Sequence, residues 1–211
     1  MFWIILIIVV VAFFFWVGHN ANTQGPIELK NFEDALNTLE QNPNSPSDYD
    51  HCIEIWKKNT WIQSEDLFSG GCYDRLLKLC EENSSHVKSW QLLGEVLQRV
   101  DSAFGINSTG KRQKNNTLRV LSDNLFKELQ NEVIKERILS LINLISSIPE
   151  SETKELYETA LNTLKDNPSS QEAKRLVLDL GRLHYGRLRP DKKPTVYDEQ
   201  AIQNDIIVRS Q

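Results

Sequence analysis

Cysteine and catalytic motifs are scarce in this chain of 211 residues, and β-branched runs are rare outside its first 18 residues. Its three cysteines, Cys52, Cys72 and Cys80, show no CxxC spacing. We therefore expect no disulfide framework, and the odd count favours a reducing compartment. The four histidines form no HExxH motif and do not pair at metal-ligand spacing. We accordingly expect no metal site, no cofactor and no enzymatic activity.

Charged and polar side chains are also missing from an apolar run that extends from Phe2 to Val17. Backbone polar groups in hydrocarbon must pair internally, so such a run forms a helix in a bilayer. At 1.5 Å per residue it spans roughly 25 Å, slightly less than the hydrocarbon core. Trp3 and Trp16 lie near its two ends, where indole rings favour the headgroup boundary.

A cleavable signal peptide is the alternative to a retained anchor. Signal peptides begin with a basic region, but no Lys or Arg precedes this run. Cleavage after Ala21 would place His19 where a small residue is required. We therefore predict a single-pass membrane protein with an anchor at residues 1–18. The first lysine, Lys30, is surrounded by acidic residues, so only the cysteine usage indicates an orientation, with the soluble part on the cytoplasmic side.

Beyond the anchor, apolar residues recur at spacings of three and four, without a convincing alternation of period two. This pattern predicts an all-α body. The stripes consist of Leu76, Leu77, Leu79 and Cys80, then of Trp90, Leu93, Val96, Leu97 and Val100, and then of a long third set from Val120 to Ile145. Pro149, followed by Ser151, indicates a helix break and a restart.

One helical segment occurs twice in the sequence. The repeated pattern is Glu-x-x-Leu-Asn-Thr-Leu, found from Glu33 to Leu39 and again from Glu158 to Leu164. Each copy leads to an Asn-Pro pair. Proline disfavours the α conformation in the residue before it, so each helix should end at the asparagine. Serines follow both Asn-Pro pairs, and a serine at the start of the next helix accepts hydrogen bonds from its free amides.

A third helix pair contains Trp90-x-x-Leu93-Gly94-x-x-Leu97. This spacing resembles the first-helix signature of a tetratricopeptide repeat (TPR), W-x2-L-G-x2-Y, with Leu in place of Tyr. No pair of units follows at the 34-residue period of that family, and an irregular helical bundle with recurrent turns is the alternative. The resemblance implies antiparallel helix hairpins whose grooves hold partners instead of catalysing reactions.

These features divide the chain into an anchor at 1–18, a tether at 19–27, a helical domain at 28–188 and a C-terminal tail at 189–211 with one short helix. The tail helix either docks back on the body or binds a partner. We predict an interaction or accessory protein that is held in the lipid bilayer from Phe2 to Val17 and binds another protein near the membrane.

A nucleotide-binding enzyme is a different class of function that the sequence raises. The stretch from Gly105 to Lys111 matches the first seven positions of the P-loop pattern. The eighth position is Arg112, where a Ser or Thr should hold Mg²⁺, and the preceding residues indicate a helix instead of a strand. We therefore expect a solvated loop from Phe104 to Thr117.

The candidate partner-binding residues are a tryptophan beside a predicted helix break and a basic cluster near the C-terminus. The break is at Asn59 and Thr60. The cluster runs from Arg182 to Lys193 and either binds an anion, lipid or nucleic acid, or opposes the negative end of a helix. No nucleic acid is expected, because residues 21–106 hold 14 acidic and 7 basic residues. The candidates are Trp61, Arg182, Tyr185, Arg187, Arg189, Lys192 and Lys193, with Trp56 and Trp90 as further contacts.

Overall fold

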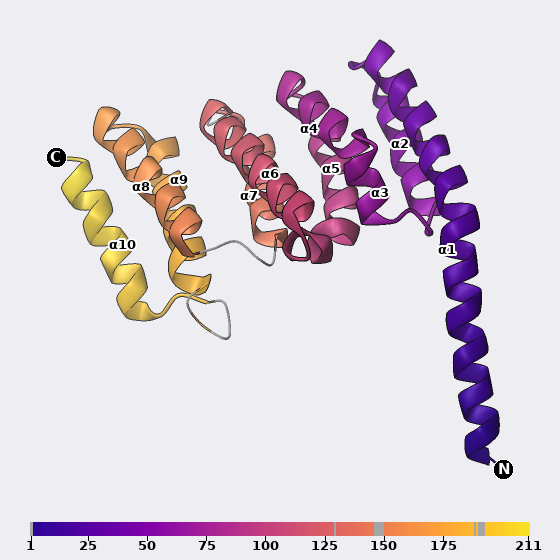
Figure 1. Ribbon diagram of the computed structural model, residues 1–211. Coiled ribbons are helices and arrows are strands. Elements are labelled where there is room, and N and C mark those ends of the chain that lie inside the picture. The colour runs from indigo at the N-terminus through magenta and orange to yellow at the C-terminus, as the bar shows by residue number, and fades with distance from the viewer. Residues whose placement is uncertain (1, 129, 146–149, 188, 190–192) are drawn as a thin grey trace. The chain divides into compact units, whose positions relative to one another are not determined.

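A computed structural model describes residues 2–128, 130–145, 150–187, 189 and 193–211 of the chain (Figure 1). Every regular element in these ranges is a helix, so the predicted all-α class is confirmed there. The chain forms two compact units, Met1–Thr117 (unit 1) and Leu118–Gln211 (unit 2). The elements are α1 (Phe2–Gln41), α2 (Pro46–Lys58), α3 (Ser64–Ser69), α4 (Cys72–Glu82), α5 (Val87–Val100), the 3₁₀ helix η1 (Asp101–Gly105), α6 (Ser108–Lys127), α7 (Glu132–Leu144), α8 (Glu150–Asp166), α9 (Gln171–Arg187) and α10 (Val196–Arg209).

The second half of α1 belongs to the core of unit 1. It packs against α2, which in turn packs against α5. Phe32, Leu36 and Leu39 of α1 are buried, and the Phe32 ring lies 5.0 Å from the ring of Trp56 on α2. Because burying one such side chain stabilises a fold by roughly 1.5–3 kcal/mol, these contacts hold α1 firmly in the unit.

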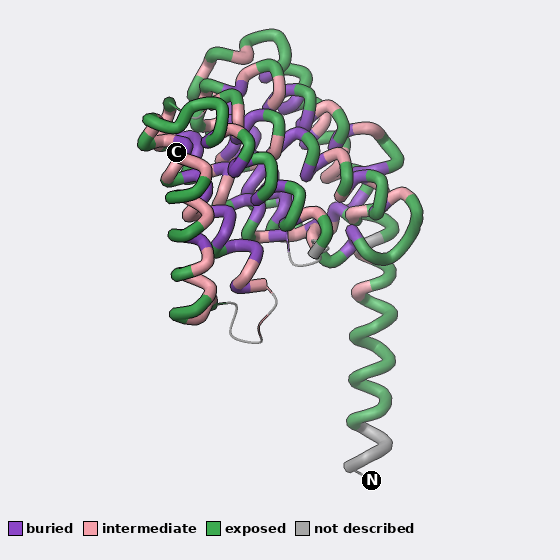
Figure 2. The backbone as a smooth tube through the Cα atoms, turned by 90° about the vertical axis from the view of Figure 1, so that its left-hand side faces the viewer, coloured by how far each residue is buried: buried purple, intermediate pink, exposed green. Residues whose placement is uncertain are grey.

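The first half of α1 has no such cover. Its side chains from residue 6 to residue 16 are exposed, and Phe15 keeps 76 % of its surface accessible. In Figure 2 this half is a green rod that leaves the purple interior. Among the described residues, α1 is the helix that is long and apolar enough to cross a membrane. The side chain of Trp3 lies outside the described part.

The residues predicted as a tether, 19–27, are helical, because α1 continues through them and through Pro26. A proline disfavours the α conformation before it in part by a clash with the preceding Cβ, and the preceding residue here is Gly25, which has none. A Cβ on Gly25 would also lie 2.9 Å from the carbonyl oxygen of Trp61. One helix therefore joins the apolar run directly to the folded body.

Both predicted Asn-Pro helix ends are confirmed. Helix α1 ends at Gln41 and α8 at Asp166, each one residue before the asparagine. Ser45 then accepts from the Asp48 N–H at 3.4 Å, and Ser170 accepts from the Ala173 N–H at 3.1 Å. The serines thus satisfy amides that the first turn of a helix leaves without partners.

The loop expected from Phe104 to Thr117 is instead the end of η1 and the first half of α6. Asn107 starts α6, since its side-chain oxygen accepts from the Gly110 N–H at 2.8 Å. Gln113 and Thr117 are polar but fully buried. A search for apolar periodicity misses such a helix, because polar side chains occupy part of its inner face.

The long apolar stripe from Val120 to Ile145 belongs to two helices, α6 and α7. Asn131 caps α7, with its side chain accepting from the Ile134 N–H at 3.4 Å. Val133 is 62 % exposed and does not belong to the buried stripe. Pro149 lies outside the described residues, and α8 begins at Glu150, one residue before the predicted restart.

In unit 2, α8 packs against α9, and α10 packs against both. Of the two alternatives left open for the tail helix, the structure therefore shows docking on the body. Ile202 of α10 is fully buried against Gly181 of α9, where an added Cβ would lie 2.8 Å from the Ile202 side chain. Thr195 and Asp198 form a capping box at the start of α10, which fixes the entry of the chain into this helix.

The two glycines of the P-loop-like stretch predict a contrast in stability. A Cβ at position 110 would lie 2.2 Å from the Ala103 carbonyl oxygen, whereas a Cβ at position 105 meets nothing within 4 Å. Gly110→Ala should lower the free energy of unfolding by about 1–3 kcal/mol, the usual range for overpacking. Urea unfolding of the detergent-solubilised chain measures this. Gly105→Ala is the matched control and should be neutral, and equal effects of both variants would contradict the packing.

Candidate functional site

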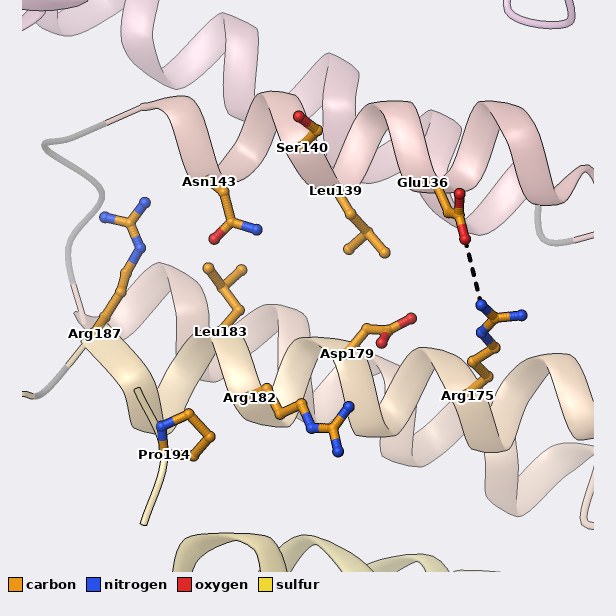
Figure 3. Close-up of a pocket in the computed structure, with 10 residues that line it drawn as sticks. All are labelled: Glu136, Leu139, Ser140, Asn143, Arg175, Asp179, Arg182, Leu183, Arg187 and Pro194. Atoms are coloured by element: carbon orange, nitrogen blue, oxygen red, sulfur yellow. Dashed lines mark hydrogen bonds and ion pairs between the residues drawn. The ribbon is translucent and has the colours of Figure 1, made fainter. Parts of the chain in front are cut away.

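A groove of about 560 Å³ lies in unit 2 between α7 and α9 (Figure 3). A volume of this size is typical of sites that bind small molecules or peptide side chains. The lining residues of α7 are spaced three, one and three apart, and those of α9 are spaced four, three, one and four apart. Each set therefore shares one helix face. The lining residues are Glu136, Leu139, Ser140, Asn143, Arg175, Asp179, Arg182, Leu183, Arg187 and Pro194.

Two arginines of α9 bridge the groove at its ends. At one end Arg175 pairs across it with Glu136 at 3.3 Å (Figure 3). At the other end Arg187 donates to the carbonyl oxygens of Ile142 and Ile145, at 3.3 and 2.7 Å, where α7 ends. The last carbonyls of a helix lack intrahelical partners and carry partial negative charge, so a guanidinium stabilises them. The space between the two bridges stays open.

The Arg175 bridge is part of a charge network. Arg175 also pairs with Glu132 at 2.7 Å, and Glu132 pairs with Lys135, whose side chain is fully buried, at 2.7 Å. The hydrogen bond from Lys135 lowers the pKa of the Glu132 carboxyl. A buried ammonium group is costly unless it is paired, so the network keeps this end of the groove ordered.

Asp179 lies between the bridges, with its carboxylate directed into the groove (Figure 3). Partial burial raises the pKa of this carboxyl, although Lys135, Arg175 and Arg182 act against the shift. Within the described residues, its carboxylate makes no hydrogen bond or ion pair with a partner side chain. Leu139 and Leu183 flank it as apolar walls. Asp179 is therefore an acidic acceptor that the folded unit does not use.

The residues of the predicted basic cluster lie at different places in the structure. Arg182 and Arg187 line the groove, but Arg182 also pairs with Glu199 of α10 at 2.7 Å. Arg189 pairs with Asp198 at 2.9 Å. Arg189 lies beyond the end of α9 at Arg187, so it does not share a helix face with Arg182 and Tyr185. The acidic start of α10 folds back and compensates much of the positive charge.

The other members of the cluster lie apart from the groove. Tyr185 lies beside a smaller cavity of about 370 Å³, where its ring is 6.0 Å from that of Tyr157. Lys193 is exposed, and Lys192 lies outside the described residues. Asp179 was not among the predicted site residues. The sequence does contain one signal for it, since this acidic residue is flanked on both sides by leucine in Leu176-Val177-Leu178-Asp179-Leu180.

Trp61 belongs to unit 1, in the loop of residues 59–63 between α2 and α3, and the predicted helix break before it is confirmed. The Trp61 N–H donates to the Glu28 carboxylate at 2.6 Å, and the Asn59 amide donates to the Glu28 carbonyl oxygen at 3.1 Å. The Trp61 ring lies edge-on to the Trp16 ring, with centroids 5.5 Å apart. This loop is thereby attached to α1 at the end of the apolar run.

Trp56 and Trp90 are not surface contacts, which corrects their assignment as partner-binding residues. Both side chains are buried, and their indole N–H groups donate to the carbonyl oxygens of Glu95 and Ser84, at 2.9 and 2.7 Å. The Arg99 guanidinium lies over the Trp56 ring, 4.1 Å from its centroid. A buried tryptophan needs such a partner for its N–H, so both residues serve the core.

The P-loop-like stretch does not have the geometry of a phosphate-binding loop. A P-loop presents free backbone N–H groups between a strand and a helix. Here the Gly110 N–H is bound to the Asn107 side chain, and the Lys111 N–H is bound to the Asn107 carbonyl oxygen at 3.0 Å. The element before it is the helix pair α5 and η1.

Searches of family models, of curated proteins and of solved structures find no match to this chain.

Asp179 predicts a pH dependence of stability. Because folding raises its pKa, the folded protein holds this proton more tightly than the unfolded chain does. Its contribution to stability therefore falls as the pH rises from the unfolded pKa through the folded pKa. Asp179→Asn should raise the melting temperature at pH 7, and the melting temperature should fall less steeply as the pH rises above about 4, the ordinary pKa of an aspartate. Thermal unfolding at several pH values tests this. The exposed Asp166→Asn is the control, and an equal profile for wild type and Asp179→Asn would contradict the prediction.

Proposed function

We propose that this chain is a single-pass membrane protein that holds a partner protein near the membrane. The observation that carries the proposal is the uncovered apolar half of α1, which continues without interruption into a half that is buried in unit 1. A surface of this kind is unfavourable in water and favourable in hydrocarbon. Anchoring a binding surface in this way raises its effective concentration near membrane partners.

The body in this proposal is a set of helix hairpins similar to tetratricopeptide repeats. Two observations support the similarity. On α5 the signature residues Trp90, Leu93, Gly94 and Leu97 are all buried. On α9 the same spacing recurs as Val177, Leu180, Gly181 and His184, which are also buried. Gly181 permits the close approach of α10, as a small residue at that position of a repeat should.

The groove between α7 and α9 is the proposed site for the partner. An acidic acceptor between two leucine walls suits a Lys or Arg side chain with apolar neighbours. The two arginine bridges are 12 residues apart on α9, which corresponds to roughly 18 Å. An extended segment of about five residues fills such a length. The occupant we propose is therefore a short extended segment of another protein with a central basic residue.

The other candidate functions have less support. A nucleotide-binding enzyme that uses the stretch from Gly105 to Lys111 lacks the free backbone amides of a P-loop. An anion, lipid or nucleic-acid binder that uses the basic cluster from Arg182 to Lys193 would need donors that α7 and α10 already occupy. Because the arginines of the groove are already paired, the acidic Asp179 is left to bind, which favours a cation as the occupant.

We also propose that the soluble part faces the cytoplasm. Cys52, Cys72 and Cys80 are buried free thiols, and such thiols suit a reducing compartment. Protease digestion of sealed vesicles distinguishes the two orientations.

Membrane insertion predicts resistance of the full chain to alkaline carbonate extraction. Two arginines near the centre of the apolar run from Phe2 to Val17 cost about 5–7 kcal/mol, at 2.5–3.5 kcal/mol each, so Val9→Arg with Val10→Arg should release the chain from membranes. Immunoblots of pellet and supernatant measure the partition. The matched control is Ile207→Arg with Val208→Arg, which changes two exposed apolar residues of α10. If carbonate released the wild type or the α10 control as fully as the Val9→Arg, Val10→Arg variant, the anchor would be refuted.

The groove predicts selective peptide binding. A fluorescein-labelled Leu-Ala-Lys-Ala-Leu peptide should bind the detergent-solubilised chain, and the same peptide with Glu in place of Lys should not. Asp179→Asn should weaken binding of the lysine peptide about tenfold, or 1.4 kcal/mol, the usual size of a charge-assisted hydrogen bond. Fluorescence anisotropy measures both affinities.

Asp166→Asn, an exposed substitution at the end of α8, is the control for that measurement and should leave binding unchanged. Equal affinity for the two peptides, or an unchanged affinity after Asp179→Asn, would exclude Asp179 as the acceptor of a basic side chain.

A further inference from the structure

Residues 59–63 are held at one fixed position along α1 by several contacts. The Trp61 N–H and the Asn59 amide both bind Glu28, and the backbone of Trp61 passes so close to Gly25 that a Cβ there would lie 2.9 Å from its carbonyl oxygen. The Trp61 ring reaches the Trp16 ring. These contacts fix the height of the loop along α1.

That height falls within the headgroup layer of a bilayer. From Phe2 to Gly25 the helix rises roughly 35 Å at 1.5 Å per residue. The hydrocarbon core is about 30 Å thick, and the headgroup layer adds about 5–8 Å on each side. Gly25 therefore lies within that layer even when Phe2 lies at the far edge of the core, and any tilt of α1 lowers it further.

The composition of this region suits that position. Residues 18–27 of α1 and residues 59–63 of the loop contain no Asp, Glu, Lys or Arg. Ile27 is 57 % exposed, and Thr60 and Gln63 are exposed. Tryptophan with an apolar neighbour and uncharged polar residues is the composition that favours the membrane–water interface.

We infer that residues 59–63 form a second membrane contact, in which the backbone of the loop lies in the headgroup layer, the Trp61 ring reaches down toward Trp16 in the hydrocarbon core, and unit 1 is held directly against the bilayer. The partner of this surface is the lipid interface itself. The inference rests on the proposed insertion of α1. It adds that unit 1 does not move freely on a linker but has one fixed face toward the membrane.

Site-directed spin labelling tests this contact in the full chain, reconstituted in phosphatidylcholine vesicles. Single nitroxides are attached at Thr60→Cys and Gln63→Cys, with Val10→Cys as the reference in the apolar run. Asn44→Cys, exposed in the turn between α1 and α2, is the aqueous control. The native thiols interfere little, because burial raises the pKa of Cys52 and of Cys72 to about 12 and keeps them protonated.

The measured quantity is the ratio of collisions with O₂, which concentrates in hydrocarbon, to collisions with a water-soluble nickel chelate. We expect the ratio to be highest at position 10, lowest at 44 and intermediate at 60 and 63, several-fold above position 44. A deep label at 10 with values at 60 and 63 equal to that at 44 overturns this inference and leaves the proposed anchor intact. An aqueous value at position 10 overturns both.

Discussion

Helix α1 is buried along one half and uncovered along the other, and the arrangement of unit 1 depends on this division. Phe32, Leu36 and Leu39 fix the second half in the core, while residues 6–16 remain without protein contacts that bury them. Two different environments thus act on one continuous helix. Because α1 stays helical through Gly25 and Pro26, although Pro26 has no N–H to donate, no non-helical segment separates the apolar half from the folded unit.

In unit 2, ion pairs and charge-assisted hydrogen bonds connect the helices. Arg175 and Arg187 connect α9 to α7 at two separate points, and Arg182 and Arg189 connect to the acidic first turn of α10. Exposed ion pairs contribute little to stability one by one, but networks fix geometry. The result is a groove whose positive groups are engaged and whose remaining carboxylate is that of Asp179.

Some of this structure follows directly from local sequence. The helices before Pro43 and Pro168 end at the Asn-Pro pairs, and serines at 45 and 170 cap the next helices. The helical period of residues 90–100 likewise predicts a buried stripe without reference to any other part of the chain. The first half of α6 was missed because Gln113 and Thr117, which are polar, lie on its buried side.

The candidate site was predicted only in part. Arg182 and Arg187 do line the groove, because a basic helix end tends to lie near carbonyl or carboxylate groups. Their actual partners, Glu199 and the last carbonyls of α7, are far away in the sequence, and no local pattern specifies them. Asp179 is a candidate acceptor because it is partly buried in the groove, and burial is a property of the packed unit.

The sequence by itself determined the helical class, the apolar run, and the helix ends at Asn-Pro, since each of these depends on residues within one or two turns of each other. Only the tertiary structure decided that residues 19–27 continue the helix, that Trp56 and Trp90 are core residues while Trp61 meets Trp16, and that acidic residues of α10 neutralise the basic cluster. The physical reason is that burial and ion pairing depend on groups brought together from distant positions, whereas periodicity and capping do not.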